Sequence, residues 1–504
     1  MKTIIAFLTF FAASLSLAQL APQKLIVPEK FKSVFATDRM LSIDPQYEIS
    51  VFYAGSPLTR PRFMAFNEKQ VLHTADLFGG AVFALPDLNK DGIADTAIAV
   101  TPHVDSVHSI AFYKGTLYVA EPSKIRRFQD KDGDGFYETE LAPFYAGIPA
   151  SGPYNHFTRT ILIDSVKKYL YVSVGASCNA CRESSPDRAV ILRFDLEGSG
   201  GAGKKVYATG FRNAIGLALH PDGSLWATNA DRDGLGDSIP QEMITQVKED
   251  GFYGWPFAYG DKNWNDFNAN AEYQAMLPIT NVDSARVSSM YAADVYIPAH
   301  STPMGILFYH DPRVYIQAPP ITGFVAVHGS SPNGKKVGLG YHVIKIEYDK
   351  LSTKWNVSTF LEGFLTDSVN YKYWSRPCGI IQDTSGYDMF VSSDAGIGAI
   401  YRITLKEHND TSPSKPTIRL NVSASPNPTN GSISIDLYGL YAQTATVTVC
   451  DVTGRELDVL RSRYVASDRS VIYSLDLSNE ATSVYFCIIR SEAGMKIVPI
   501  HVIH

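Results

Sequence analysis

Histidine, arginine, asparagine and aspartate side chains recur in short motifs that suit proton transfer and the binding of an oxygen-rich anion. Histidine exchanges a proton near neutral pH, whereas arginine and asparagine donate hydrogen bonds to flat anionic ligands. The candidates are His156 in NHFTR, Arg212 and Asn213 in GFRNA, Asp231 and Arg232 in NADRDG, His300 in HSTPMG, His328 in VAVHGS, Arg376 in WSRPCG and Asp394 in SSDAG. Any one of them could be purely structural, so the chemistry depends on whether the fold gathers them.

Two acidic loops have the spacing of oxygen ligands for a hard cation. Side chains at positions 1, 3 and 5 of a tight loop converge on one point, and glycine at position 6 permits the turn. Neither loop has glutamate at position 12, where Ile98 and Leu141 stand, so neither is a complete EF-hand. Both are expected to bind structural calcium, and the alternative is a solvated acidic turn. The candidate ligands are Asp87, Asn89, Asp91 and Asp95 in the first loop, and Asp130, Asp132, Asp134 and Glu138 in the second.

Five cysteines allow one local crosslink and leave the others open. Cys178 and Cys181 form a CxxC pair, and no second CxxC or CxxH is present to complete a zinc site. In an exported protein this spacing favours a disulfide. Cys450 and Cys487 lie in one short region and could pair, which leaves Cys378 as a buried thiol.

The elements that must position these side chains are strands in a recurring pattern of strand, polar loop and strand. Copies begin at residues 71, 115, 168, 223, 323 and 387, an average spacing of about 60 residues. Each copy alternates apolar and polar residues, and none could bury its faces alone. The pattern predicts an all-β protein whose main domain is a six-bladed β-propeller. A series of β-sandwiches is the alternative, but it explains the repeat less well.

Several candidate residues directly follow strands of different repeats. In a propeller the strand-end loops converge around the axis, so one ligand could meet side chains from several blades. Substrate selectivity is expected in the long loop from Asp261 to Tyr296, which contains no readable motif.

The two ends of the chain indicate export. Residues 1–18 place Lys2 before an apolar stretch that ends in small residues, as in a secretory signal cut after Ala18. Residues 19–407 would form the propeller, and 408–417 a polar, proline-containing linker. Residues 418–504 alternate like a small antiparallel β-sandwich, and their SPNPTNG motif resembles the C-terminal sorting domain of type IX secretion. That resemblance implies the type IX machinery as a partner and a secreted or outer-membrane-surface location; a carbohydrate-binding or spacer sandwich is the alternative.

Composition narrows the remaining function classes. The 45 Lys and Arg against 51 Asp and Glu give a net charge of −6, which argues against nucleic-acid binding because phosphates attract a basic excess. The 28 Tyr, 26 Phe, 37 Gly and 28 Pro suit strands and turns and disfavour a helical bundle. After the signal no apolar run is long enough to span a membrane. Neither a GxGxxG fingerprint after a strand nor a CxxCH haem motif occurs, so a nicotinamide, flavin or c-type haem enzyme is unsupported.

From about Gln46 to Leu405 the chain resembles the soluble quinoprotein glucose/sorbosone dehydrogenase superfamily, most closely its L-sorbosone or pyranose dehydrogenase branch. The resemblance is carried by NHFTR, SVGASCNACRE, ATGFRNAIGLALHPDGSLWATNADRDGLGD, FYGWPFAYG, HSTPMG, VAVHGS and WSRPCGI. It implies a six-bladed propeller that binds pyrroloquinoline quinone (PQQ) and Ca²⁺ and oxidises a sugar. Electrons would then leave to an external acceptor.

The resemblance also implies roles for individual residues. His156 matches the general base, and Arg212 and Asn213 match the pair that contacts the quinone. Backbone carbonyls near Asp231 and Arg232 match the position of the cofactor-linked calcium.

Arg376 matches an arginine that pairs with the cofactor carboxylates, and Asp394 an acidic residue beside it. The family's cofactor-binding lysine is replaced here by VAVHGSSPNGKK, in which His328, Lys335 or Lys336 could substitute. The alternatives to a dehydrogenase are a non-catalytic propeller that binds glycans or a partner, and a calcium-dependent lactonase-type hydrolase.

Overall fold

The computed structural model describes residues 20–150, 156–310, 321–332, 337–406, 420–439, 443–451, 455–465, 471–491 and 494–503. These residues fall into two compact units, one within 20–406 and one within 420–503. Both are built from strands, so the predicted all-β class is confirmed. The expected signal at 1–18, the linker at 408–417, and Lys335 and Lys336 lie outside the described residues.

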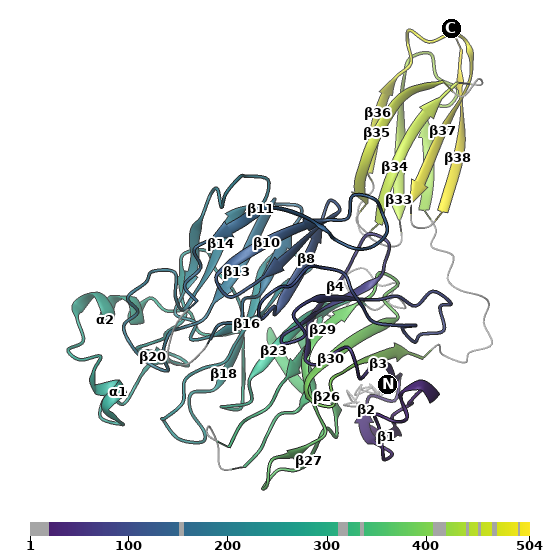
Figure 1. Ribbon diagram of the computed structural model, residues 1–504. Helices are drawn as coiled ribbons and strands as arrows, with labels where there is room; N and C mark the ends of the chain where they lie inside the picture. Colours follow the sequence, from purple (N-terminus) through teal and green to yellow (C-terminus); the bar gives the residue numbers. More distant parts are fainter. Residues whose placement is uncertain are drawn as a thin grey trace, which may run out of the picture. The chain divides into compact units, whose positions relative to one another are not determined.

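Six sheets with a core of four antiparallel strands form most of the first unit among its described residues (Figure 1). In five of them the four strands follow one another in chain order, and in the sixth the fourth strand comes from the N-terminal part of the chain. The strands of the first three sheets are β4 (Pro61–Phe66), β5 (Leu72–Asp76), β6 (Val82–Leu85), β7 (Ile98–Ala99); β8 (Ser109–Tyr113), β9 (Thr116–Ala120), β10 (Lys124–Gln129), β11 (Thr139–Ala146); and β12 (Ile161–Asp164), β13 (Tyr169–Val174), β14 (Val190–Asp195), β15 (Lys205–Thr209), with β19 (Gly251–Phe252) added in parallel. The other three contain β16 (Ala214–Leu219), β17 (Leu225–Asn229), β18 (Glu242–Gln246), β22 (Val295–Ile297); β23 (Pro303–Tyr309), β24 (Thr322–Val327), β25 (His342–Asp349), β26 (Lys354–Glu362), extended by β2 (Met40–Ile43) and β1 (Ala21–Lys24); and β29 (Ser375–Gln382), β30 (Asp388–Gly396), β31 (Ala399–Leu405), β3 (Tyr47–Ala54).

The first strands of the six sheets meet in a closed cycle. β4 contacts β8, β8 contacts β12, β12 contacts β16, β16 contacts β23, β23 contacts β29, and β29 contacts β4. Five of the six recurring sequence patterns correspond to the second and third strands of one sheet, for example β5 with β6 and β9 with β10. Strand β17 and its turn account for the copy at 223. The repeat in the sequence therefore corresponds to a repeat of sheets whose first strands contact one another around the cycle.

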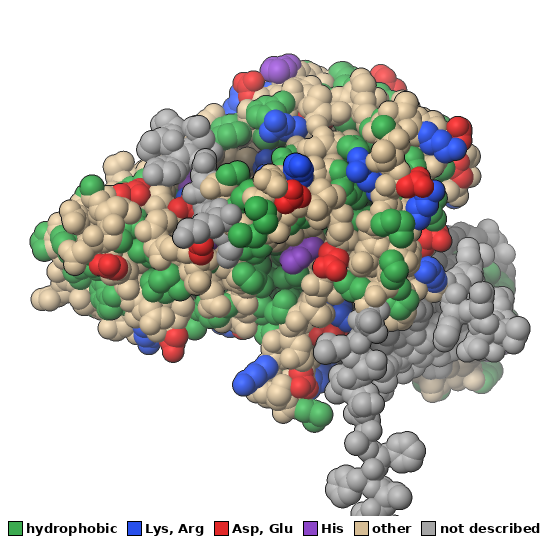
Figure 2. Space-filling view, turned by 90° about the horizontal axis from the view of Figure 1, so that it is seen from below, with side chains coloured by type: hydrophobic (Ala, Val, Ile, Leu, Met, Phe, Trp, Pro, Cys, Tyr) green, Lys and Arg blue, Asp and Glu red, His purple; other side chains and the backbone are tan. Residues whose placement is uncertain are grey.

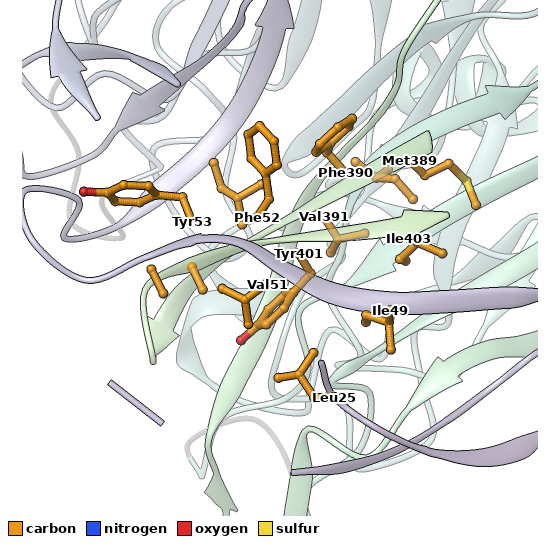
Figure 3. Packing of buried hydrophobic residues seen from close by; sticks show 14 of the residues in the cluster. Leu25, Ile49, Val51, Phe52, Tyr53, Met389, Phe390, Val391, Tyr401 and Ile403 are labelled. Atoms are coloured by element: carbon orange, nitrogen blue, oxygen red, sulfur yellow. The ribbon is translucent and has the colours of Figure 1, made fainter. Parts of the chain in front are cut away.

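The cycle is closed by pairing between distant parts of the chain. β3, near the start of the described chain, pairs with β31, near residue 405. Figure 3 shows the packing that accompanies this pairing, where the alternating side chains of β3 point to opposite faces. On one face Val51 lies near Tyr401, and on the other the Phe52 and Phe390 rings meet edge to face at 4.9 Å. Burial of each such side chain stabilises the closed form by about 1.5–3 kcal/mol.

Smaller elements extend the loops of the first unit. They are the two-stranded sheets of β20 (Ala258–Tyr259) with β21 (Asn263–Trp264) and of β27 (Leu365–Asp367) with β28 (Lys372–Tyr373), the 3-10 turn η1 (Glu29–Phe31), and the helices α1 (Ala271–Gln274) and α2 (Asn281–Ser288). Among the described residues, no helix has the length and apolar character needed to cross a membrane. On the face drawn in Figure 2, acidic and basic side chains are interspersed and neither sign forms a continuous patch.

The second unit consists of two antiparallel sheets among its described residues. One sheet contains β32 (Leu420–Ser425), β33 (Ser432–Gly439) and β36 (Val471–Asp476), and the other contains β34 (Gln443–Cys450), β35 (Glu456–Val465), β37 (Ser483–Ser491) and β38 (Gly494–Val502). Its core combines side chains from both sheets, including Ile433, Ile435, Val447 and Ile489. The alternation read from the sequence therefore places one apolar row of each sheet inside.

The structure confirms two of the three cysteine predictions and contradicts the third. Cys178 and Cys181 form the expected disulfide, and Cys378 is a fully buried free thiol. The suggested pairing of Cys450 with Cys487 is wrong, because both are free. They stand on adjacent strands, but Cys450 is opposite Phe486 and Cys487 is opposite Val449, a one-residue offset. Successive side chains of a strand point to opposite faces, so this offset directs the two thiols away from each other.

Candidate active site

The predicted catalytic and cofactor-binding residues lie at one end of the sheets. In each sheet the start of the first strand pairs with the end of the second, as Ala214 pairs with Asn229 and Ser375 with Gly396. The candidates occupy these two positions in four different sheets: His156 precedes β12, Arg212 and Asn213 precede β16, Asp231 and Arg232 follow β17, His328 follows β24, Arg376 starts β29 and Asp394 ends β30. Since the inner strands form a cycle, these side chains surround one axis.

His156 is held in the form that a general base requires. Its Nδ1 donates to the carbonyl of Ala176 at 2.9 Å, which leaves Nε2 with a free lone pair. Burial, and after it the positive charge of Arg212, lower the pKa of His156 to about 3. The imidazole is therefore neutral over the ordinary pH range, with Nε2 able to accept a proton.

Asn213 and His156 close on the backbone between them at Gly175. A methyl group at Gly175 would stand 2.5 Å from the Asn213 Oδ1 atom and 2.7 Å from the His156 Cβ atom, so only glycine fits. The backbone nitrogen of Asn213 donates to the side-chain oxygen of Asn229 at 3.0 Å. This contact ties the segment before β16 to the end of β17 and orients Asn213 beside the histidine.

Arg212 belongs to a charged group that sequence reasoning described only in part. Its Nη2 lies 3.5 Å from Asp233 Oδ2, and the other Asp233 oxygen lies 2.9 Å from His300 Nδ1. His300 Nε2 lies 2.9 Å from the carbonyl of Gly236, so both ring nitrogens face acceptors. The hydrogen bond to Asp233 therefore raises the pKa of His300. Burial opposes ionisation of Asp233, but His300 and Arg212 together lower its pKa.

Asp394 and His328 form a second and more buried group. His328 Nε2 lies 2.6 Å from Asp394 Oδ1, and Arg62 Nη2 lies 2.7 Å from Asp394 Oδ2. Arg62 also donates through Nη1 to His108 Nδ1 at 3.2 Å. Burial would raise the pKa of Asp394, yet His328 and Arg62 lower it well below its usual range. Asp394 is thus an ionised carboxylate that joins its own sheet, through β30, to the sheets that carry Arg62 and His328.

Arg376 is directed by backbone and aromatic contacts. Its Nε donates to the carbonyl of His328 at 3.0 Å, and its Nη2 to that of Gly329 at 2.6 Å. The guanidinium lies over the rings of Tyr341 and Tyr373. Because it makes no salt bridge among the described residues, its charge remains available to an anionic ligand.

The loop expected to provide calcium-binding carbonyls is rigidly held. Arg232 is 1% exposed, and its guanidinium donates to Pro256, Ala258 and Asn265 oxygens. Its Nε and backbone nitrogen both bond to the Asp231 carboxylate. The backbone oxygens of residues 231 and 232 accept no hydrogen bond from any described residue, which leaves them free for a cation.

The Glu242 side chain holds this loop in place through a hydrogen bond to its backbone. Its carboxylate accepts from the backbone nitrogen of Asp231 at 2.6 Å and from that of Thr302 at 3.4 Å. Complete burial, and the neighbouring charge of Asp231, raise the pKa of Glu242 to about 8. Glu242 therefore joins the segments that carry Asp233 and His300.

Both acidic loops lie at the opposite end of their sheets. They follow β6 and β10, the third strands, which leave from the end of the sheet away from Arg62 and His108. In the second loop, oxygens of Asp130, Asp132 and Glu138 converge within 4.8 Å of one another.

In the first loop the Asp87 carboxylate accepts from the backbone nitrogens of Asp91 and Gly92, as the Asp130 carboxylate of the second loop accepts from those of Gly133 and Gly135. The Asp95 carboxylate accepts from Leu88, and Asn89 bonds to Asp91. These loops are separate from the strand-end group.

Sequence reasoning missed Arg62, His108, Arg159, Asp233 and Glu242. A positional signal was present, because Arg62, His108, Arg159, Arg212 and Arg376 all stand within two residues of the start of a first strand. Asp233 lies in the NADRDG motif, in which only Asp231 and Arg232 were predicted as candidate residues.

The strand-end group has an excess of buried cationic donors. Burial, and the nearby charge of Arg188, lower the pKa of Arg159 to about 9. Of the six buried side-chain polar atoms without a partner among the described residues, four belong to this group, namely Arg62 Nε, His108 Nε2, Arg212 Nε and Asn229 Nδ2, and the other two are Arg39 Nε and Arg193 Nε. Buried donors ordinarily have partners, so this arrangement suits an anionic, hydrogen-bond-accepting ligand.

Comparison with known families matches residues 41–406 to a family described as TrAA12-like. Residues 423–503 match a secretion system C-terminal sorting domain. No curated protein matches the sequence.

Among solved structures, a carbohydrate-active enzyme of family AA12 from Trichoderma reesei is 19% identical to this chain, with a TM-score of 0.60 over 72% of this chain and 97% of that chain. The holo form of the pyranose dehydrogenase PQQ domain from Coprinopsis cinerea is 16% identical, with a TM-score of 0.58 over 75% of this chain and 98% of that one. At these identities the likeness concerns the fold.

Proposed function

Because the chain belongs to the TrAA12-like family, we propose that it is a PQQ-dependent dehydrogenase that oxidises a sugar of the pyranose or sorbosone type. Its C-terminal sorting domain directs it to type IX secretion and hence to the cell surface or the exterior. The holo pyranose dehydrogenase domain that shares its fold binds PQQ, which supports the same cofactor here.

We further propose that the six sheets are the blades of a propeller and that the second unit is a sandwich. The closed cycle of inner strands supports the first assignment, since a propeller is a radial array of four-stranded sheets. The shared apolar core of the two C-terminal sheets supports the second. A propeller would carry the site at one end of its axis.

The observation that carries the functional proposal is the excess of buried arginines and unpartnered donors around a neutral histidine. Arg62 and Arg212 each have an Nε without a partner, and Arg376 has no carboxylate partner among the described residues. PQQ carries several carboxylates and quinone oxygens, which are the acceptors that such donors require. The donor set at this end therefore fits the cofactor.

Bound PQQ would supply the two-electron acceptor that the protein itself lacks. Arg376 would hold its carboxylates, and Arg212 with Asn213 would direct N–H groups at the quinone oxygens, where negative charge develops. Oxidation of a sugar hydroxyl removes a hydride from carbon and a proton from oxygen. His156 Nε2 takes that proton, and electrons leave afterwards to an external acceptor.

Calcium is proposed at the backbone carbonyls of Asp231 and Arg232. These oxygens are unbonded among the described residues, and oxygen ligands are those that calcium prefers. The residues themselves would supply no side chain, because the Asp231 carboxylate is already bound by Arg232. The two acidic loops would bind structural calcium at the far end of the sheets.

The test is reconstitution of the purified full chain with PQQ and calcium, followed by reduction of a dye with a panel of aldoses. His156→Ala should lower kcat by about 10²–10⁴-fold, the usual contribution of a general base. His220→Ala is the matched control, because His220 is a largely buried histidine that packs on Trp226 at the far end of β16. Undiminished turnover by His156→Ala would remove it from the base role, and absence of quinone binding would favour a non-catalytic propeller.

A further inference from the structure

A pocket opens beside the candidate active site, next to the hairpin of β20 and β21. This hairpin lies with α1 and α2 at one side of the first unit (Figure 1). The pocket has a volume of about 450 Å³, within the range of roughly 300–1,000 Å³ that small-molecule sites occupy. One wall is the loop with Gly234, Leu235 and Ile239, and the other contains Tyr259, Trp264, Asn265, Asp266 and Ala269.

The lining combines aromatic faces with hydroxyl and carboxylate oxygens that are open to a ligand. Trp264 is 39% exposed, unlike the buried Trp226, Trp255 and Trp374. The Tyr259 hydroxyl makes no hydrogen bond to any described residue, and Asp266 uses one carboxylate oxygen to accept from Asn268 at 2.9 Å. An aromatic ring offers an apolar face, while hydroxyl and carboxylate groups exchange hydrogen bonds. A ligand with both apolar faces and hydroxyl groups would match this lining.

The charges of the lining restrict the ligand further. It contains one carboxylate, Asp266, and no lysine, arginine or histidine. An anion such as a phosphate or a second organic acid would meet no cation here and would be repelled by Asp266. This is the reverse of the neighbouring strand-end group, in which arginines predominate. The pocket therefore suits a neutral polyhydroxylated molecule.

The pocket and the candidate active site share one loop. Gly234, in the pocket wall, directly follows Asp233, which bonds to His300 at 2.9 Å. Gly236 in the same loop accepts from the other nitrogen of His300. Asn265 lines the pocket and also accepts from Arg232 at 2.9 Å. A chain of linked sugar units that entered the active site would pass this wall.

We propose that this pocket is a binding subsite for a second sugar unit, so that the substrate is an oligosaccharide and not only a free monosaccharide. The proposal rests on the proposed sugar oxidation, whose substrate class it narrows. Trp264 provides the face on which the sugar ring stacks, and Tyr259 and Asp266 bond to its hydroxyl groups. The long loop from Asp261 to Tyr296, in which selectivity was expected, contributes Trp264 and Asp266.

The test measures binding separately from turnover. Cellotetraose, maltotetraose, xylotetraose and glucose are titrated into the full chain, with tryptophan fluorescence and calorimetry as readouts. At least one tetrasaccharide should bind more tightly than glucose, and Trp264→Ala should weaken that binding by about tenfold or more. Trp264→Phe, which keeps a ring, should retain most of it. Phe136→Ala is the matched control, because Phe136 is 37% exposed but lies in the second acidic loop.

The outcomes separate the two proposals. Tetrasaccharide binding that depends on Trp264 supports the subsite even if reconstitution yields no quinone-dependent turnover. Turnover in which kcat/KM for glucose equals that for every tetrasaccharide, with Trp264→Ala unchanged, supports the dehydrogenase and overturns the subsite. The subsite is also overturned if none of the three tetrasaccharides binds, or if Phe136→Ala weakens binding as much as Trp264→Ala.

Discussion

Two aspartate–histidine pairs occupy the same end of the sheets and behave in opposite ways. Asp394 lies 2.6 Å from His328, and Asp233 lies 2.9 Å from His300. Burial dominates the first pair and lowers the pKa of His328, whereas the hydrogen bond to Asp233 dominates the second and raises the pKa of His300. Similar geometry therefore gives a neutral histidine in one place and a readily charged one in the other.

The second partner of each aspartate explains the difference. The Asp394 side chain is 2% exposed, and Arg62 at 2.7 Å already balances its charge, so His328 need not be protonated. The Asp233 side chain is 48% exposed, and Arg212 is only at 3.5 Å. His300 also faces the Gly236 carbonyl, which only a second N–H can satisfy. Burial and the nearest cation together decide the charge state, and the contact itself does not.

The largest expected effect comes from neutralising the buried aspartate. Asp394→Asn leaves Arg62 buried without its counter-charge, and breaking a buried ion pair in this way costs about 3–5 kcal/mol. The free energy of unfolding is measured in urea by tryptophan fluorescence, which reports only the first unit because all five tryptophans lie there. The exposed Asp261→Asn serves as the control. If Asp394→Asn lowered the free energy of unfolding by less than about 1 kcal/mol, the Asp394 group would not stabilise the fold more than the Asp233 pair does.

A mid-sized effect is expected in the pH dependence of stability through Glu242, which supports the Asp233 loop. Its folded pKa, about 8, is above the usual 4.5. The folded state therefore binds the proton more tightly, and stability falls as pH rises from about 4.5 to about 8. Glu242→Gln resembles the protonated form and should flatten this fall by about 1 kcal/mol or more. An unchanged slope in urea titrations at pH 5 and pH 8 would contradict the assignment.

The sequence predicted the repeat and that most of the candidate residues follow strand ends, but it did not predict how these side chains pair. Alternation and strand-end position placed His156, Arg212 and Arg376 at one end of the sheets. The partners Arg62 and Glu242 belong to short segments without a motif. Arg62 reaches the group because the distant first strands β4 and β29 meet, and Glu242 reaches it because β18 pairs with β17. The failed Cys450–Cys487 pairing has the same origin, because a strand register offset by one residue leaves no trace in spacing.

Residue type also gives no information on charge state. His156, His300 and His328 are equivalent as letters, and their different pKa values arise from Arg212, Asp233 and burial. Such neighbours are supplied by tertiary structure. The acidic loops show the converse, since their motif is recognisable locally while their position at the far end follows only from the strand order.

The smallest expected effect is that of Asp233→Asn, and its pH dependence is the sharper test of the comparison. The raised pKa of His300 adds stability that is fully present below its usual value near 6.5 and is lost as pH rises through the folded value. The lowered pKa of Asp233 adds stability above its usual 3.8 that is lost as pH falls. The pair therefore stabilises most between these limits, by less than about 1 kcal/mol because Asp233 is half exposed. Asp233→Asn should lower stability more at pH 5.5 than at pH 9, where less of the His300 charge remains and Arg212 at 3.5 Å still faces Asp233, and the His300 ring signals in NMR should titrate at lower pH. An equal loss at both pH values would mean that Asp233 acts through packing, and its difference from Asp394 would then be one of position rather than charge.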